Sequence, residues 1–171
     1  MSKFYSTKTY GTDRGLSCCF RQWRATHSHC STLHGYSIGI KLVFGSDSLD
    51  DKNWVMDFGG LKGFKAWADN MFDHTLVIAK DDPHLLFFQQ MANMGSVPIS
   101  GIGDQGFDKV KPHERGAICD LRVVDGVGCE MFAKMCYDKM TEILCESGYN
   151  RVYVKSAEVF EHAGNSAIYE V

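Results

Sequence analysis

Three histidines and one cysteine lie together in the eight residues from His27 to His34, which read His-Ser-His-Cys-Ser-Thr-Leu-His. Neutral imidazole is a common metal ligand near pH 7, and zinc suits three nitrogen donors with a fourth position open for substrate or water. His27 and His29 are two residues apart, so in extended backbone they point to the same side, and His34 could complete the set after a turn. The segment therefore predicts a metal site. The plain alternative is a polar hairpin loop that happens to hold three histidines.

Cys30 stands among these histidines, unlike the other six cysteines of the chain. A thiolate beside a cation has a lowered pKa and can act as a base or a nucleophile. The total of seven cysteines is odd and contains no C-x-x-C pair, which argues against a disulfide framework or a Cys-rich zinc finger. We expect most of the remaining cysteines to act as small buried hydrophobic residues.

Two further segments carry groups suited to acid–base chemistry or ligand binding. In Asp73-His74-Thr75 a carboxylate beside an imidazole can orient the ring and support a proton relay. The alternative is a histidine that complements a helix dipole. Glu161 ends a predicted strand, and a carboxylate suits the paired N–H donors on the edge of a pterin or guanine. It is otherwise an ordinary glutamate at a strand end.

Helices and strands that would position these groups follow from the hydrophobic periodicity. Alternating apolar residues predict strands over 16–26, 36–45, 151–160 and 167–171. Apolar spacing of three and four residues, together with an Asp-Asp-Pro start signal, predicts helices over 61–73, 84–94 and 128–147. The order is strand–strand, helices, strand–strand, with the first two strands as a hairpin. This order predicts an α+β fold, an antiparallel four-stranded sheet with helices on one face.

Length and composition limit the domain count and the partners. The 171 residues predict a single domain over 1–171, with an insertion in the Gly- and Pro-rich stretch around 95–117. A net charge of −3 provides no electrostatic footprint for nucleic acid or an anionic membrane. No apolar run approaches the roughly 20 residues that span a bilayer, and the N-terminus lacks the apolar core of a signal peptide. We therefore expect a cytoplasmic protein.

Six segments together resemble the family of 6-pyruvoyl-tetrahydropterin synthase and 6-carboxy-tetrahydropterin synthase. They are similar to the family's aromatic-x-Ala-x-His, Cys-x-x-x-His-Gly-His, Val-x-Asp-Phe-x-x-Leu-Lys, Leu-Asp-His, Pro-Thr-x-Glu-Asn and late-strand Glu motifs. In the same order they are Trp23 to His27, Cys30 to Tyr36, Val55 to Lys62, Phe72 to His74, Gly128 to Ala133 and Glu158 to Glu161. The resemblance implies the tunnelling fold (T-fold), and a homohexamer, a dimer of trimers, with active sites between subunits.

The resemblance also implies a zinc-dependent lyase with a small-molecule pterin substrate, dihydroneopterin triphosphate. Cys30 would be the catalytic base, Asp73 and His74 would form a second acid–base relay from a neighbouring subunit, and Glu161 would hold the pterin ring. The triphosphate needs cations, for which the candidates are Arg21, Arg24 and Lys155.

One expected zinc ligand is missing. His27 and His34 match two of the family's ligands, but Tyr36 stands where the second histidine of His-Gly-His is expected. We hypothesise that His29 replaces it. The other readings are a Tyr36 phenolate, which its ordinary pKa near ~10 disfavours, and a weak or absent metal site.

Within the family, the short Cys30–His34 segment and the compact chain favour the 6-carboxy branch, which leads toward 7-deazaguanine compounds such as queuosine. The first alternative is 6-pyruvoyl-tetrahydropterin synthase. The second is a non-catalytic T-fold paralogue that binds pterins or purines, because the loss of one zinc ligand suits a binding protein.

Overall fold

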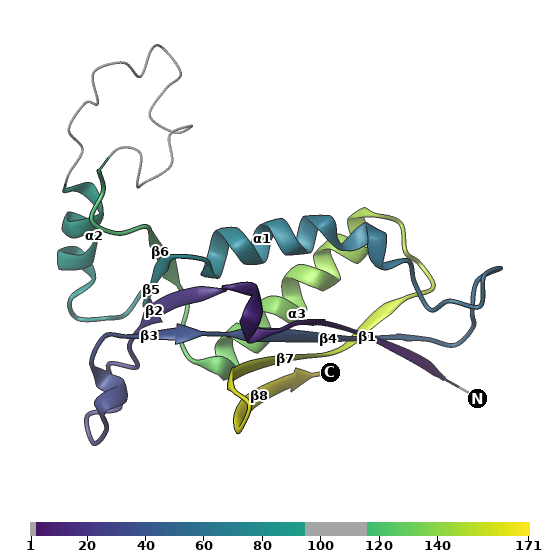
Figure 1. The fold of residues 1–171 in the computed structure, drawn as a ribbon, viewed down its shortest axis with the longest axis horizontal. Helices are drawn as coiled ribbons and strands as arrows, with labels where there is room; N and C mark the ends of the chain where they lie inside the picture. Colours follow the sequence, from purple (N-terminus) through teal and green to yellow (C-terminus); the bar gives the residue numbers. More distant parts are fainter. Residues whose placement is uncertain (1–2, 95–115) are drawn as a thin grey trace, which may run out of the picture.

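The computed structural model describes residues 3–94 and 116–171, and within these residues it contains two four-stranded sheets (Figure 1). The main sheet is antiparallel in the order β1-β4-β7-β8. Its strands are β1 (Phe4–Tyr10), β4 (Gly39–Ser46), β7 (Tyr153–His162) and β8 (Asn165–Glu170). The second sheet has the order β3-β2-β5-β6. Its strands are β2 (Ser17–Phe20), β3 (His34–Ser37), β5 (Thr75–Ala79) and β6 (Leu121–Val124).

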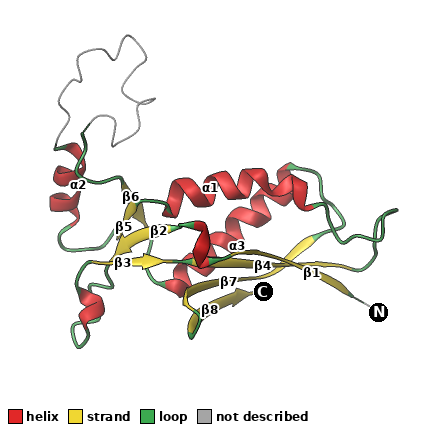
Figure 2. Cartoon of the chain, viewed as in Figure 1, coloured by secondary structure: helices red, strands yellow, loops and turns green. Residues whose placement is uncertain are grey.

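Helices α1 (Lys62–Phe72) and α3 (Cys129–Glu146) cover one face of the main sheet, whereas α2 (Leu85–Asn93) packs on the second sheet (Figure 2). Both covering helices carry an apolar stripe at helical spacing, which drives their burial against the sheet. Their fully buried side chains include Phe64 and Phe72 of α1 and Phe132 and Met140 of α3. The predicted α+β T-fold, with an antiparallel four-stranded sheet and helices on one face, is confirmed. No helix in the described part of the chain is long and apolar enough to cross a membrane.

The strands at the N-terminus differ from the prediction. The polar segment Phe4–Tyr10, for which no strand was expected, forms the edge strand β1. The expected strand over 16–26 ends at Phe20, because the backbone turns where the Ala25 N–H donates to the Gln22 carbonyl at 2.8 Å. The expected strand over 36–45 is divided at Ile38. The predicted hairpin is therefore β2–β3 of the second sheet, and the main sheet takes β1 and β4 instead.

Strand β5 was also missed, and its position explains why. It pairs in parallel with both β2 and β6, and all five of its residues are buried. A parallel strand buried on both faces is a continuous apolar run without alternation, so it carries no period-two signal. The predicted insertion around 95–117 lies almost entirely outside the described residues.

Candidate active site

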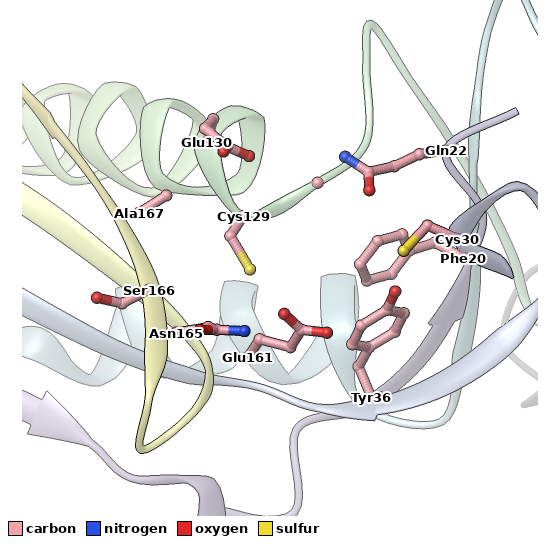
Figure 3. A pocket seen from close by; sticks show the side chains of 11 residues that line it. Phe20, Gln22, Cys30, Tyr36, Cys129, Glu130, Glu161, Asn165, Ser166 and Ala167 are labelled. Carbon is pink, nitrogen blue, oxygen red and sulfur yellow. The ribbon is translucent and has the colours of Figure 1, made fainter. Parts of the chain in front are cut away.

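A pocket of about 170 Å³ opens where the N-terminus of α3 meets the end of β7 and the start of β8 (Figure 3). Side chains from four separate parts of the chain converge on it. Those with polar or reactive groups are Gln22, Cys30, Tyr36, Cys129, Glu130, Glu161, Asn165 and Ser166. Figure 3 shows the Cys30 sulfur, the Tyr36 hydroxyl and the Glu161 carboxylate directed into the same space. A thiol, a phenol and a carboxylate in one small pocket can bind and deprotonate a polar ligand.

Cys30 reaches the pocket from the loop 21–33, which joins β2 to β3. The loop is closed at its base, where the Gln22 N–H donates to the Cys30 carbonyl at 2.8 Å. A short 3-10 turn, η2 (His29–Ser31), follows Ser28, whose hydroxyl accepts from the Cys30 N–H at 3.2 Å. Both backbone groups of Cys30 are therefore held, and the half-buried thiol is presented to the pocket by a defined backbone.

Tyr36 lies on β3, two residues after His34, with its ring stacked on Phe20 of β2. The ring centroids are 4.0 Å apart and the planes differ by 11°. Phe20 in turn contacts Phe132 of α3 edge-on, at 5.1 Å between centroids. Burial, together with the nearby Cys30 and Glu161, raises the pKa of Tyr36 to about 12. The side chain is thus a neutral phenol fixed by an aromatic stack, a hydrogen-bond donor rather than a phenolate at neutral pH.

Glu161 brings a carboxylate to the pocket from the end of β7, and Glu130 brings a second one from the start of α3. Burial raises the pKa of the neighbouring Cys129 thiol to about 11, with further contributions from Glu161 and Glu130. Cys129 is therefore a neutral thiol at neutral pH. Among the described residues, no lysine or arginine lines this pocket, and its carboxylates suit a neutral ligand edge that offers N–H donors.

Asp73 and His74 form the predicted pair but do not line the pocket. His74 Nδ1 lies 2.6 Å from Asp73 Oδ1 at the end of α1. The His74 backbone has a φ of +56° and its N–H donates to the Ser17 carbonyl at 2.6 Å, which fixes the turn into β5. The His74 side chain is 85% exposed. Within this chain, the pair is available to a partner molecule and not to Cys30 and Glu161.

The three predicted metal ligands lie in or beside the same loop without forming a cluster. The ring centroids of His29 and His34 are 6.1 Å apart. His34 Nδ1 donates to the Thr32 carbonyl at 2.9 Å, which leaves Nε2 for other contacts. His27 is exposed. Among the described residues, no three His, Cys, Asp or Glu side chains converge as a metal site. The donor types suit zinc, but their arrangement does not, because a third ligand is not brought to the His29–His34 pair.

The three candidate cations for a triphosphate are each paired with a carboxylate. Arg21 pairs with Asp82 at 2.7 Å, Arg24 with Asp81 at 2.8 Å, and Lys155 with Glu170 at 3.2 Å. None of the three lines the pocket. Of these, Arg21 is the least exposed, with 17% of its side chain accessible.

Sequence reasoning missed the contribution of Gln22, Cys129 and Asn165 to the pocket. The available sequence signal was the glycine at position 128, directly before α3. Its φ is +113°, a conformation that L side chains rarely adopt. A side chain there would also meet the Gln22 amide, 2.7 Å from the position of a Cβ. Gln22 and Asn165 carried no comparable signal, because their segments approach α3 only in the folded chain.

Comparisons with known proteins identify the family and the fold. The sequence model of the family "6-pyruvoyl tetrahydropterin synthase" matches residues 12–171. A 6-carboxy-5,6,7,8-tetrahydropterin synthase of Aquifex aeolicus is 28% identical over 142 residues, which cover 82% of this chain and 75% of that protein. The enzyme of the same name from Rickettsia conorii is 33% identical over 57 residues, which cover 33% of this chain and only 41% of that protein.

Solved structures show the same fold at low identity. An uncharacterized protein from Wolinella succinogenes superposes with a TM-score of 0.69 at 20% identity and covers 99% of both chains. A 6-pyruvoyltetrahydropterin synthase from Plasmodium vivax superposes with a TM-score of 0.61 at 15% identity and covers 100% of this chain and 99% of that one. The family match over residues 12–171, which the shared fold accompanies, establishes that this chain belongs to the 6-pyruvoyl tetrahydropterin synthase family.

Proposed function

We propose that this chain is a lyase that converts 7,8-dihydroneopterin triphosphate to 6-carboxy-tetrahydropterin, a step toward 7-deazaguanine (queuosine-type) compounds. One observation carries the proposal: Cys30, Tyr36 and Glu161, from three separate segments, line the same pocket. The names of the similar Aquifex and Rickettsia proteins support the 6-carboxy branch over the 6-pyruvoyl branch.

Glu161 would hold the pterin ring. The amino group and ring N–H of a pterin form a pair of donors that matches the two oxygens of a carboxylate. Gln22 and Asn165 would add amide contacts to the ring from opposite sides of the pocket. Because no lysine or arginine of residues 3–94 and 116–171 lines the pocket, the triphosphate would extend out of it toward cations elsewhere.

Cys30 would remove a proton from the side chain of the bound substrate. Its place in the same pocket as Glu161 allows one ligand to touch the ring-binding carboxylate and the base together. The neutral Tyr36 hydroxyl would donate a hydrogen bond to a substrate oxygen at which negative charge develops. Asp73 and His74 would serve as a second acid–base relay in the pocket of a neighbouring copy, in a homohexamer. The exposure of His74 and its contact with Asp73 support this assignment.

Zinc is the proposed cofactor, and His27, His29 and His34 would hold it. It would act as a Lewis acid on the side-chain oxygens of the substrate. The ring centroids of His29 and His34 are 6.1 Å apart, and His27 would have to join this pair through a movement of the loop.

Product identification tests the function. The purified chain would be incubated with dihydroneopterin triphosphate, and the products separated and identified by mass spectrometry, with Cys30→Ala as the control. We expect 6-carboxy-tetrahydropterin together with acetaldehyde and triphosphate, all absent from the Cys30→Ala reaction. A 6-pyruvoyl product would move the chain to the other branch. Binding of the pterin without turnover would support the non-catalytic reading.

A further inference from the structure

Two arginine–aspartate pairs of the described residues tie the loop 21–33 to the turn that follows β5. In the first, Arg21 donates from Nε to Asp82 Oδ2 at 2.8 Å and from Nη2 to Asp82 Oδ1 at 2.7 Å. This fork-to-fork geometry fixes both planar groups in distance and direction. The Asp82 side chain is 1% exposed and that of Arg21 17% exposed, so the pair is shielded from solvent.

The topology of the second sheet explains why these residues meet. Strands β2 and β5 are neighbours and run parallel, with Cys18 beside Thr75 and Cys19 beside Leu76. Their carboxyl ends therefore lie at the same edge of the sheet, where Arg21 directly follows β2 and Asp82 follows β5 three residues after its end. The two side chains meet above this edge.

Asp82 is itself held in place. Its Oδ1 accepts from the His84 N–H at 2.8 Å, and its own N–H donates to the Ala79 carbonyl at 3.0 Å. Burial opposes its ionisation, but the hydrogen bonds from Arg21 and His84 outweigh it and lower the pKa of Asp82. A charged, rigid carboxylate therefore receives Arg21.

Arg21 also contacts the backbone of the segment around Cys30. Its third nitrogen, Nη1, donates to the Ser31 carbonyl at 3.4 Å. The next residue, Gln22, donates its N–H to the Cys30 carbonyl at 2.8 Å. The two peptide groups that flank Ser31 are therefore held, the Cys30–Ser31 group by the Gln22 N–H and the Ser31–Thr32 group by the Arg21 guanidinium. Direct contacts thus connect Asp82, through Arg21 and Gln22, to the backbone at Cys30.

We propose that Asp82 is a positioning residue, which orients the Cys30 thiol toward the pocket by locking the Arg21 guanidinium under the loop. The inference rests on the proposed function in that Cys30 is taken as the base. Its structural part, the control of the Cys30 thiol by a side chain from the turn after β5, can be measured without a substrate.

The second pair provides a matched control. Arg24 and Asp81 join the same loop to the same turn at 2.8 Å, but their side chains are 73% and 47% exposed. Exposed ion pairs contribute little because water and salt screen them. Asp81→Asn therefore removes one charge beside Asp82 while leaving the Arg21–Asp82 fork intact.

The experiment compares the full-length wild type with Asp82→Asn, Arg21→Lys and Asp81→Asn. The rate at which iodoacetamide modifies Cys30 is followed by peptide mass spectrometry, which separates Cys30 from the other cysteines. We expect Asp82→Asn and Arg21→Lys to speed Cys30 alkylation at least ~3-fold, because a loosened loop opens more often. Asp81→Asn should leave the rate unchanged. In Arg21→Lys a positive charge remains opposite Asp82, but the two parallel hydrogen bonds of the guanidinium are lost. This variant therefore tests the paired hydrogen bonds without removing either charge of the pair.

Steady-state kinetics with dihydroneopterin triphosphate supplies the second readout. Misplacement of the base should lower kcat by about 10- to 100-fold while KM stays within about 3-fold. A raised KM at unchanged kcat in Arg21→Lys, with unchanged alkylation, would overturn the proposal and make Arg21 a triphosphate ligand. Alkylation of Cys30 at the wild-type rate in folded Asp82→Asn and Arg21→Lys would also overturn it. If the wild type shows no turnover, the proposed function fails, whereas the alkylation rates still decide the positioning role.

Discussion

Tyr36 lies flat on Phe20, with ring centroids 4.0 Å apart and planes 11° from parallel. The stack places the Tyr36 phenol in the pocket. In the Cys-x-x-x-His-Gly-His motif that the chain resembles, this position holds the second histidine. The two rings come from adjacent strands, β2 and β3, with Phe20 paired to His34 in the register. This position therefore carries a neutral hydroxyl where the motif that the chain resembles has a histidine.

Replacing Tyr36 with phenylalanine should isolate the role of this hydroxyl, since the ring stack on Phe20 is retained. We expect kcat/KM to fall about 10-fold, the effect of one lost hydrogen bond of ~1.4 kcal/mol. Thermal unfolding should be little changed. Wild-type kinetics in Tyr36→Phe would show that the hydroxyl does not touch the substrate.

Substitution of Cys30 by alanine should remove the proposed base. Loss of a general base lowers rates by about 100- to 10,000-fold, so we expect a fall in kcat of this size. The Kd for the pterin, measured by fluorescence titration, should change little because Glu161 remains. Cys145→Ala is the matched control, since Cys145 is an exposed thiol outside the pocket. Turnover by Cys30→Ala at the wild-type rate would refute the assignment.

Glu161→Gln should weaken pterin binding rather than the chemical step. A hydrogen bond to a charged group contributes about 1.5–3 kcal/mol, which corresponds to a Kd increase of roughly 10- to 150-fold. Glu170→Gln is the control, because Glu170 pairs with Lys155 and does not line the pocket. An unchanged Kd in Glu161→Gln would mean that the pterin ring binds elsewhere.

The zinc hypothesis predicts about one zinc per chain by elemental analysis of the purified protein. The metal should be lost in His29→Ala and retained in Tyr36→Phe if His29 is the third ligand. The reverse pattern would transfer the third ligand to Tyr36. A protein without metal in all three forms, after purification with added zinc, would contradict the whole ligand set.

The lowered pKa of Asp82 predicts acid sensitivity of the fold. Its carboxylate is favoured in the folded state, so its contribution to stability is complete above the ordinary aspartate pKa near ~3.9 and is lost as the pH falls through the lowered folded value. Urea unfolding of the wild type between pH 6 and pH 3 should show this decline, and Asp82→Asn should show a smaller one. Identical slopes for the two proteins would mean that Asp82 does not carry the effect.

The sequence by itself was sufficient for the helices and the two C-terminal strands, and it supplied the candidate reactive side chains. The helices α1 and α3 and the strands β7 and β8 carry long periodic patterns, because each buries one face only, and local spacing records this. Cys30 stood out because it lies among three histidines, whereas Glu161 and the Asp73–His74 pair were singled out by the resemblance to a known family. Asp73 and His74 do contact each other, as adjacent residues can through local geometry alone.

Only the tertiary structure decided which of these groups share a site. Cys30 and Glu161 are far apart in the sequence and meet through the sheet order and the approach of α3, which no local pattern encodes. The same holds for Arg21 and Asp82, separated by 61 residues and joined because β2 and β5 are parallel neighbours. The edge strand β1 and the buried strand β5 were missed for a related reason. The residue types that suit these strands depend on which segments pack on each face of the sheet, and those segments are distant in the chain.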